Sequence, residues 1–528
     1  MPVKVLVSDK LSEQGVEILK RSGLEVDVKT KLTPEELIKE IKNYDGLVVR
    51  SATKVTAAVI AAADRLKVIG RAGSGLDNVD INAASKKGIV VMNTPGGNTI
   101  TTAEHAISMM CSMARLVPQA TASMKAGQWE KNKFNGVEMY NKTLGIIGIG
   151  QIGGYFAKVA QGMGMHVIGY DPYLSEENAK KMGIKQVDLD AIFRQSDFIT
   201  IHTPLTAETK NLINKDTIAI MKKGVRIINC ARGGIINETD LYDALKSGQV
   251  AGAALDVFEK EPVDPKHPLL THENFIATPH LGASTTEAQE NVAFAVAEQI
   301  VDYLVRGVIR NAVNLPSVSP DLLPEVQLYL TLAEKLGSLQ SQLYEGGLQK
   351  VEIEYRGRVS ELSTAQITIA VLKGLLSPIL ENSVNYVNAP IIAKERGISV
   401  HESKTSDAGD FSSMIVVRVH TAQASGYVAG ALYSHKDPRI VEIDGFTLEV
   451  VPEGCLLLIS NNDKPGVVGN LGTLLGDHGI NIARLQLSRE KINGKAISVI
   501  SVDTPVPAPV VAKIKKLPNI LSVKQIVL

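Results

Sequence analysis

The sequence predicts an α/β protein of several domains, and three observations lead to that prediction. At 528 residues the chain is too long for one hydrophobic core, so we expect roughly three or four domains. Short β-branched runs alternate with helical periodicity up to about residue 306, which is typical of parallel sheets covered by helices on both faces. The last stretch reads strand, helix, strand, strand, helix, strand, which is the ferredoxin-like order.

Composition excludes several classes of protein. Apolar residues make up 45% and charged residues 21% of the chain, which is ordinary for a folded globular protein. Lys+Arg and Asp+Glu both number 56, so the basic excess of a nucleic-acid binder is absent. Cys111, Cys230 and Cys455 lie too far apart for a disulfide framework or a Cys-rich metal site. Without a signal-peptide core or an apolar run near the ~20 residues of a membrane span, we expect a cytoplasmic protein.

Two series of strands are predicted before residue 316. The first comprises residues 3–8, 46–49, 66–69 and 90–92, with helices such as 34–43 and 57–63 between them. The second comprises residues 143–147, 166–170, 197–201, 225–229, 252–255 and 275–277. Long helices over 103–115 and 286–306 are expected to join or cross the two units.

The regular alternation of strand and helix patterns ends at about residue 315. Pro316, Pro320 and Pro324 mark a linker or boundary. A mixed α/β stretch follows up to about residue 451. The ferredoxin-like pattern then comprises strands over 455–460, 480–488, 496–502 and 520–527, with helices over 466–478 and 508–516.

A glycine motif indicates a Rossmann-type dinucleotide site. Gly148, Gly150 and Gly153 follow the apolar run 144–147 and open a predicted helix, and the next strand ends at Asp171. The glycines let the backbone approach a pyrophosphate at the helix N-terminus. A carboxylate at Asp171 accepts hydrogen bonds from the ribose hydroxyls and repels a 2′-phosphate, so NAD is preferred over NADP. The alternative is a glycine-rich turn with a solvated aspartate.

Three predicted strands deliver charged side chains to one region. Arg232, Glu261 and His280 follow the strands over 225–229, 252–255 and 275–277, and loops beyond the carboxyl ends of parallel strands line the ligand crevice. A histidine is the natural base for the proton of an alcohol, and a carboxylate orients it. An arginine grips a substrate carboxylate bidentately. The alternative for each is a packing histidine or a surface charge.

Several short segments match the motifs of one enzyme family. They are residues 71–78 (RAGSGLDN), the glycine motif, 229–234 (NCARGG), 255–258 (LDVF), 261–262 (EP) and 279–284 (PHLGAS). Together they resemble the D-2-hydroxyacid dehydrogenase family and, within it, the long-form phosphoglycerate dehydrogenases. The resemblance extends over the entire chain.

The resemblance implies a division of the chain and a set of site residues. A flavodoxin-like substrate domain would cover 1–97 and 284–315, an NAD-binding Rossmann domain 98–283, an intervening domain 317–451 and an ACT domain 453–528. Arg232 would bind substrate, and His280 would act as acid/base paired with Glu261. Beside the three glycines, the cofactor contacts implied are Gln151, Ile152, Asp171, Thr203, Cys230, Asp256 and Gly282.

The implied reaction is NAD-dependent oxidation of D-3-phosphoglycerate to 3-phosphohydroxypyruvate, the first step of L-serine biosynthesis. Such a substrate carries a second anion, and Arg50 and Arg71 stand at strand ends that line a cleft. With Ser74 and Gly75 they are the expected substrate-binding residues. The alternative for each arginine is a surface residue capping its strand.

The C-terminal segments resemble an ACT domain, which senses amino acids. By that resemblance Asp463, in the loop before the first helix, and Asn481, facing it from the next strand, would bind L-serine across a pair of domains. The alternative is a module kept for assembly alone. The resemblance also implies a homodimer or homotetramer.

Two other functions compete with this prediction. A hydroxypyruvate or glyoxylate reductase of the same family would share the three catalytic residues but would not need Arg50, Arg71 or the sensing domain. An NADH-sensing corepressor would have the same fold, a partner-binding groove and long disordered tails. No metal, nucleic acid or membrane partner is expected.

Overall fold

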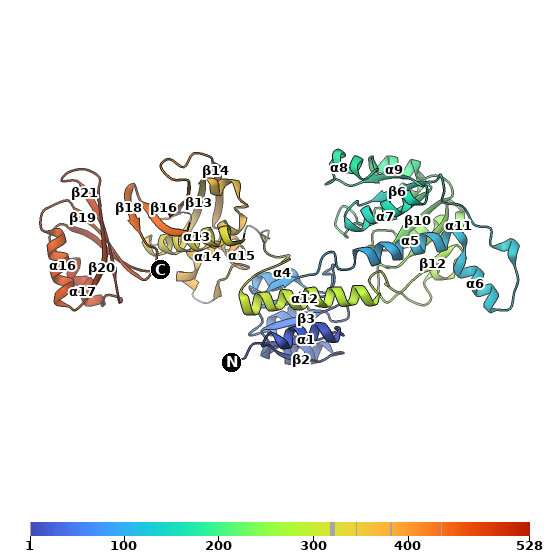
Figure 1. Ribbon diagram of the computed structural model, residues 1–528, viewed down its shortest axis with the longest axis horizontal. Helices are drawn as coiled ribbons and strands as arrows, with labels where there is room; N and C mark the ends of the chain where they lie inside the picture. Colours follow the sequence, from blue (N-terminus) through green and yellow to red (C-terminus); the bar gives the residue numbers. More distant parts are fainter. Residues whose placement is uncertain (1, 317–322, 345, 381–382, 434–435) are drawn as a thin grey trace.

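The computed structural model describes residues 2–316, 323–344, 346–380, 383–433 and 436–528. These residues form four β-sheets with their helices. In Figure 1 the lobe of the first sheet lies between those of the second and third sheets, and the fourth lies beyond the third. Residues 317–322 of the predicted linker, which include Pro320, lie outside the described residues. Helix α13 begins directly after them, at Leu323. No helix of the described residues is long and apolar enough to cross a membrane.

The first sheet is parallel, with the strand order β2-β1-β3-β4-β5 of a flavodoxin-like domain. The prediction missed edge strand β2, where Glu25 and Asp27 break the apolar pattern, and placed β4 two residues early. Arg71 is therefore the last residue of β4. The elements are β1 (Lys4–Val7), β2 (Glu25–Val28), β3 (Gly46–Val49), β4 (Val68–Arg71) and β5 (Val90–Met92), with α1 (Glu13–Arg21), α2 (Pro34–Glu40), α3 (Ala57–Ala62) and α4 (Ile81–Lys86).

Helix α12 (Thr286–Arg306) returns to this first sheet and covers one of its faces. A Cβ on Gly70 of β4 would lie 2.7 Å from Cγ2 of Val296, so the glycine allows close packing of helix on strand. Val296 and Ile300 are fully buried in the same cluster as Val5. The prediction that a long helix links the two units is confirmed.

The second sheet is also parallel, in the order β12-β11-β10-β9-β6-β7-β8 of a Rossmann fold. Its strands are β6 (Thr143–Ile147), β7 (His166–Tyr170), β8 (Lys185–Gln186), β9 (Phe198–Ile201), β10 (Val225–Asn229), β11 (Val250–Leu255) and β12 (Phe275–Ala277). Its helices are α5 (Thr99–Arg115), α6 (Val117–Lys125), α7 (Gln151–Gly162), α8 (Glu176–Lys181), α9 (Leu189–Gln195), α10 (Lys215–Ala219) and α11 (Glu238–Ser247). The prediction missed the two-residue β8, and α5 begins four residues before the predicted start at 103.

The third sheet is mixed and has the order β14-β13-β15-β16-β17-β18. Helices α13 (Leu323–Leu343) and α14 (Ala365–Leu380) pack on it through a cluster that includes Leu336, Tyr355 and Val417. The other elements are α15 (Ala389–Glu395), β13 (Leu348–Gly357), β14 (Ser399–Thr405), β15 (Ser413–Thr421), β16 (Ser425–Tyr433), β17 (Asp437–Ile443) and β18 (Phe446–Val450).

The fourth sheet is antiparallel, in the order β20-β21-β19-β22, and confirms the ferredoxin-like prediction. Its helices bury one face through Leu471 and Ile514, while Leu456 and Val499 of the other face join the core of the third sheet. The elements are β19 (Cys455–Asn462), α16 (Val467–Asp477), β20 (Ile482–Arg489), β21 (Lys495–Val502), α17 (Ala508–Ile514) and β22 (Ile520–Val527).

Candidate active site

Three parallel strands of the second sheet end side by side at the candidate site. Strand β11 lies between β10 and β12, so the loops that begin after Asn229, Leu255 and Ala277 share one edge of the sheet. Arg232, Glu261 and His280 lie in these loops. The topology therefore brings together the three side chains that the sequence delivers separately.

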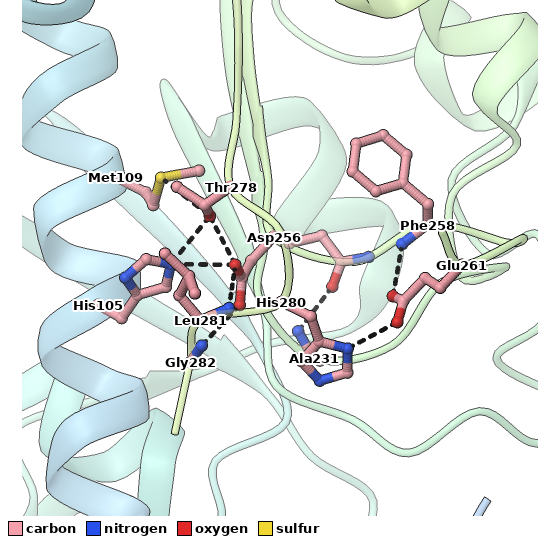
Figure 2. A network of polar contacts seen from close by, with 11 residues as sticks. His105, Met109, Ala231, Asp256, Phe258, Glu261, Thr278, His280, Leu281 and Gly282 are labelled. Carbon is pink, nitrogen blue, oxygen red and sulfur yellow. Dashed lines mark hydrogen bonds and ion pairs between the residues drawn. The ribbon is translucent and has the colours of Figure 1, made fainter. Parts of the chain in front are cut away.

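His280 and Glu261 form a hydrogen-bonded pair. Nδ1 of His280 lies 2.8 Å from Oε2 of Glu261, while the other carboxylate oxygen accepts the N–H of Phe258 at 3.1 Å (Figure 2). The hydrogen bond to Glu261 raises the pKa of His280 above its usual value, against the effect of burial. Burial would raise the pKa of Glu261, but the bond from His280 and the Phe258 amide keeps it below its usual value. The imidazole, half exposed, leaves Nε2 for a substrate proton.

Arg232 joins the loop after β10 of the second sheet to the loop after β4 of the first. Its Nε lies 3.0 Å from Oδ2 of Asp77, in the loop after β4, and Nη1 donates to the carbonyl of Ala231 at 2.7 Å. A Cβ at Gly75 would lie 2.0 Å from Nη2 of Arg232, so only a glycine leaves room for the guanidinium there. The predicted substrate residue Gly75 is thus in direct contact with the predicted substrate arginine.

Arg50 and Arg71 lie at the carboxyl ends of adjacent strands, and Arg71 lies close enough to both Arg50 and Arg232 to feel their charges. Val49, which precedes Arg50, pairs with Arg71 in the β3–β4 ladder. Nε of Arg71 donates to Oδ1 of Asn78 at 3.0 Å, and burial followed by the positive charge of Arg232 lowers the pKa of Arg71 to about 10. Three guanidinium groups crowded in this way form a strong site for an anion.

Ser74, the fourth predicted substrate residue, lies in the loop after β4. Its hydroxyl donates to Oδ1 of Asn98 at 2.7 Å, at the start of helix α5. Asn78, which the prediction did not include, donates from Nδ2 to the carbonyls of Arg50 and Thr53 at 2.6 Å each. The loop of residues 73–80 is therefore fixed to both arginine-bearing strands.

The glycine motif forms a tight turn between β6 and α7. Gly148 has φ 91°, and a Cβ there would lie 2.7 Å from the carbonyl oxygen of His202. A Cβ on Gly153 would lie 2.0 Å from the carbonyl oxygen of Gly148. Nothing lies within 4 Å of the Cβ position of Gly150, which caps α7, so open space adjoins the helix N-terminus. That combination suits a pyrophosphate.

Asp171 lies at the end of β7, beside this turn. Its Oδ2 accepts the N–H of Ile149 at 2.8 Å and its Oδ1 accepts the N–H of Tyr173 at 2.9 Å. The carboxylate is thus held against the glycine turn, with acceptor capacity left for ribose hydroxyls. It also braces the turn itself, a role that the sequence did not indicate.

The remaining predicted cofactor residues surround the same edge of the sheet. Thr203 follows β9, and its buried Oγ1 has no hydrogen-bond partner among the described residues, as expected for a group that awaits a ligand. Gln151 begins α7, where its Oε1 accepts the hydroxyl of Thr99 at 3.0 Å, and Ile152 follows it half-buried. Burial raises the pKa of the Cys230 thiol, which lies directly after β10.

Asp256 differs from the expectation of a cofactor contact. Its side chain is fully buried, and its carboxylate accepts the N–H groups of Leu281 at 2.7 Å and Gly282 at 2.8 Å (Figure 2). Thr278 and His105 complete its surroundings. Burial would raise the pKa of Asp256, but the hydrogen bonds from His105, Thr278 and Leu281 hold it below its usual value. Asp256 holds the turn that carries His280, and the prediction included neither His105 nor Thr278.

The two predicted effector residues are far apart in one chain. Asp463 follows β19, and its Oδ2 pairs with Nη1 of Arg489 at 3.0 Å. Asn481 precedes β20, and its Nδ2 donates to Asp503 at 2.8 Å. The register of β19 and β20 on β21 places them at opposite ends of that strand, roughly 20 Å apart. The expectation that Asn481 faces Asp463 from the next strand is wrong within one domain.

Three family models match successive parts of the chain. They are the NAD-binding domain of D-isomer-specific 2-hydroxyacid dehydrogenases over residues 107–282, the D-3-phosphoglycerate dehydrogenase intervening domain over 325–444, and the ACT domain over 456–519. The first match includes Arg232, Glu261 and His280. It supports a nicotinamide cofactor in this domain.

Curated relatives match the chain over almost all of its length. The D-3-phosphoglycerate dehydrogenase of Methanocaldococcus jannaschii is 47% identical, with 99% of each chain covered. That of Bacillus subtilis is 45% identical over 99% of both chains, and that of Homo sapiens 42% over 92% of both.

Solved structures match a smaller part. The TT0316 protein of Thermus thermophilus has a TM-score of 0.55 at 33% identity, covering 59% of this chain and 100% of its own. A glyoxylate reductase of Paecilomyes thermophila has a TM-score of 0.55 at 29% identity, covering 59% of this chain and 98% of its own.

Proposed function

Because the chain belongs to the D-3-phosphoglycerate dehydrogenase branch of the D-2-hydroxyacid dehydrogenases, we propose that it oxidises D-3-phosphoglycerate to 3-phosphohydroxypyruvate. This reaction is the first step of L-serine biosynthesis. The observation that carries the substrate assignment is the cluster of Arg50, Arg71 and Arg232 beside the His280–Glu261 pair. A carboxylate and a phosphate on one three-carbon acid need that much positive charge.

Proton transfer falls to His280. Since Nδ1 is held by Glu261, Nε2 accepts the hydroxyl proton of the substrate as the C2–H bond breaks and the C2=O bond forms. Glu261 stabilises the imidazolium produced, which is why its hydrogen bond raises the pKa of His280. In the reverse direction the imidazolium returns the proton to the oxygen.

Substrate positioning falls to the three arginines. Arg232 binds the carboxylate and polarises the reacting oxygen, because it lies on the same sheet edge as His280. Arg50 and Arg71 bind the phosphate, together with the loop that carries Ser74 and Gly75. The substrate carboxylate replaces Asp77 as the partner of Arg232.

The cofactor we propose is NAD. It supplies, when bound, the acceptor for the C2 hydride. The open space at Gly150 fits a pyrophosphate, and the unpartnered hydroxyl of Thr203 lies beside the same turn. The preference for NAD over NADP rests on the carboxylate of Asp171, whose charge repels a 2′-phosphate.

The assignment of domains is also a proposal. Residues 1–97 and 284–315 would form the substrate domain and residues 98–283 the NAD domain, with an intervening domain over 317–451 and an ACT domain over 453–528. The membership of strands in the four sheets supports this division.

The ACT domain is proposed to bind L-serine between two chains. Asp463 of one chain and Asn481 of a second would contribute to one site, because a single domain keeps them at opposite ends of β21. Assembly at least to a homodimer is therefore part of the proposal. Exposed apolar side chains on and after α6, namely Val117, Met124 and Trp129, offer a second surface for it.

The test is NADH formation from D-3-phosphoglycerate and NAD, with and without L-serine. Hydrazine in the assay traps the 2-oxo product, so that product accumulation does not hide a weak forward reaction. Activity that falls with L-serine supports both the catalytic and the sensing assignments. Activity that L-serine does not change would mean that the ACT domain serves assembly alone. No activity, together with fast reduction of hydroxypyruvate, would identify the competing reductase instead.

A further inference from the structure

We propose that His105 is a positioning residue for catalysis, which holds Asp256 so that the turn of residues 280–282 keeps His280 against Glu261. The proposal rests on the proposed function only in taking His280 as the acid–base group. Neither the family motifs quoted above nor the cofactor contacts include His105. It lies on helix α5, is 19% exposed at its side chain, and reaches Asp256 from the side opposite to His280 (Figure 2).

The direction of the hydrogen bonds near His105 is fixed by Thr278. The hydroxyl of Thr278 donates its one proton to Oδ1 of Asp256, at 2.5 Å. Its oxygen must therefore accept from Nε2 of His105, which lies 3.0 Å away. Nε2 also lies 3.2 Å from Oδ1 of Asp256, so one N–H serves both acceptors. His105 thus carries its proton on Nε2.

The other side of Asp256 fixes the acid–base turn. Its carboxylate accepts the N–H groups of Leu281 and Gly282, and its main-chain carbonyl accepts the N–H of His280 at 2.9 Å. His280 has φ 55°, a left-handed conformation that is unfavourable for a non-glycine residue. Such a conformation persists only when its surroundings hold it in place, and here three successive N–H groups bind a single residue.

The N-terminus of helix α5 also contacts the loop of residues 73–80, which lies beside the proposed substrate-binding arginines. Asn98 accepts the hydroxyl of Ser74 and donates from Nδ2 to Oγ1 of Thr102 at 3.2 Å. Asn98, Thr102 and His105 are spaced so that they share one face of a helix. His105 therefore ties the acid–base turn to the same helix that anchors the substrate loop.

A metal ion is the main alternative for this cluster. Ligand atoms of His105, Cys230 and Asp256 all lie within 4.8 Å of one another. Three donors already surround Oδ1 of Asp256, from Thr278, His105 and Leu281, and Oδ2 accepts the N–H of Gly282. Nε2 of His105 carries the proton of its hydrogen bond, so a metal ion could bind that atom only after the proton is lost and the bonds to Thr278 and Asp256 are broken. These contacts favour a hydrogen-bonded support.

The experiment compares His105→Gln with His105→Phe in the full-length chain. Glutamine places an N–H donor at about the position of Nε2, whereas phenylalanine keeps the volume and removes the donor. We expect His105→Phe to lower kcat by about 10- to 100-fold, because a misplaced catalytic group costs roughly that much. His105→Gln should stay within about threefold of the unmodified chain. His166→Phe, an exposed histidine at the start of β7, is the matched control.

Two further readouts separate positioning from general damage. The KM for NAD and the Kd for NADH should change less than kcat does, because the side chain of Asp256 is fully buried and exposes no atom to a cofactor. The groups that face His280 are Glu261, Asp256 and Arg232. If the turn loosens, His280 loses the Glu261 hydrogen bond, and the acid limb of the forward rate moves to lower pH. A merely structural defect lowers Tm without moving that limb.

Equal losses of kcat in the Gln and Phe variants, or an unchanged kcat in both, would overturn the proposal. Tight zinc binding that His105→Phe abolishes would overturn it in favour of the metal site. If His105→Phe does not fold, Thr278→Val removes the same link and is expected to lower kcat in the same way. If the unmodified chain does not oxidise D-3-phosphoglycerate, the proposed substrate is wrong. The comparison is then run with whichever 2-oxo acid the chain reduces, because the support acts through His280.

Discussion

Nε of Arg232 lies 3.0 Å from Oδ2 of Asp77, so an ion pair joins the cofactor side of the cleft to the loop after β4. Asp77 is largely exposed, whereas Arg232 is not. The aspartate therefore holds a guanidinium that the substrate carboxylate must take over. Removing the charge of Asp77 should therefore strengthen substrate binding rather than weaken it.

Asp77→Asn is expected to lower the KM for D-3-phosphoglycerate, because the substrate no longer competes with a carboxylate for Arg232. An exposed ion pair contributes about 0.2–1 kcal/mol, so the change should be at most about fivefold. Steady-state kinetics at fixed NAD measure it. Glu17→Gln, which breaks an exposed ion pair on α1, is the control. A KM that rises would mean that Asp77 itself positions the substrate.

Arg71→Ala is expected to raise the KM for D-3-phosphoglycerate by about 10- to 100-fold. A hydrogen bond to a charged group is worth about 1.5–3 kcal/mol, and Arg71 is proposed to bind the phosphate. Reduction of hydroxypyruvate, which lacks the phosphate, should change little. Arg21→Ala, in an exposed pair on α1, is the matched control. An equal loss with both substrates would assign Arg71 a structural role.

The rate of oxidation is expected to rise with pH through the pKa of His280, because only the neutral imidazole accepts a proton. That pKa is raised by Glu261, so the limb should lie above the usual range of a histidine. Reduction should fall across the same range, since it needs the imidazolium. Glu261→Gln should move both limbs to lower pH. If both limbs stay in place in this variant, Glu261 does not raise the pKa of His280.

His280→Ala is expected to lower kcat by about 10²–10⁴-fold, the usual contribution of a general acid–base group. Binding of NADH, followed by its fluorescence, should stay close to that of the unmodified chain. His166→Ala serves as the control for a histidine remote from the cleft. Near-normal turnover in His280→Ala would show that another group takes the proton.

Asp171→Ala is expected to raise the KM for NAD by about tenfold or more and to allow NADP to react. Part of the loss should come from the glycine turn, because the carboxylate also accepts the N–H of Ile149. Asp171→Asn keeps one acceptor oxygen while removing the charge that repels a 2′-phosphate, so it should gain NADP activity with a smaller loss for NAD. If neither variant gains NADP activity, the preference resides elsewhere.

Much of the candidate site could be predicted from sequence because it depends on local patterns. The glycine turn and the strand ends before Arg232 and His280 follow from short apolar runs and the residues directly after them. Side chains that meet across long separations could not be found in this way. His105 lies 151 positions before Asp256 in the chain, and nothing in its own helix marks it as a partner.

Two of the errors in the prediction have clear physical causes. Strand β2 contains Glu25 and Asp27, which an exposed edge strand tolerates but an apolar pattern does not reveal. Asp463 and Asn481 follow and precede strands that run antiparallel to β21, so each lies at a different end of it. Short sequence separation across the ACT domain therefore did not mean proximity in space.

The measurement that tests the central claim most directly is kcat/KM for D-3-phosphoglycerate relative to D-glycerate, with NAD as acceptor. The two acids differ only in the phosphate that Arg50 and Arg71 are proposed to bind. The account predicts a preference for D-3-phosphoglycerate of about a hundredfold or more, from two hydrogen-bonded charges at about 1.5–3 kcal/mol each. Equal values, or a preference for D-glycerate, would contradict it.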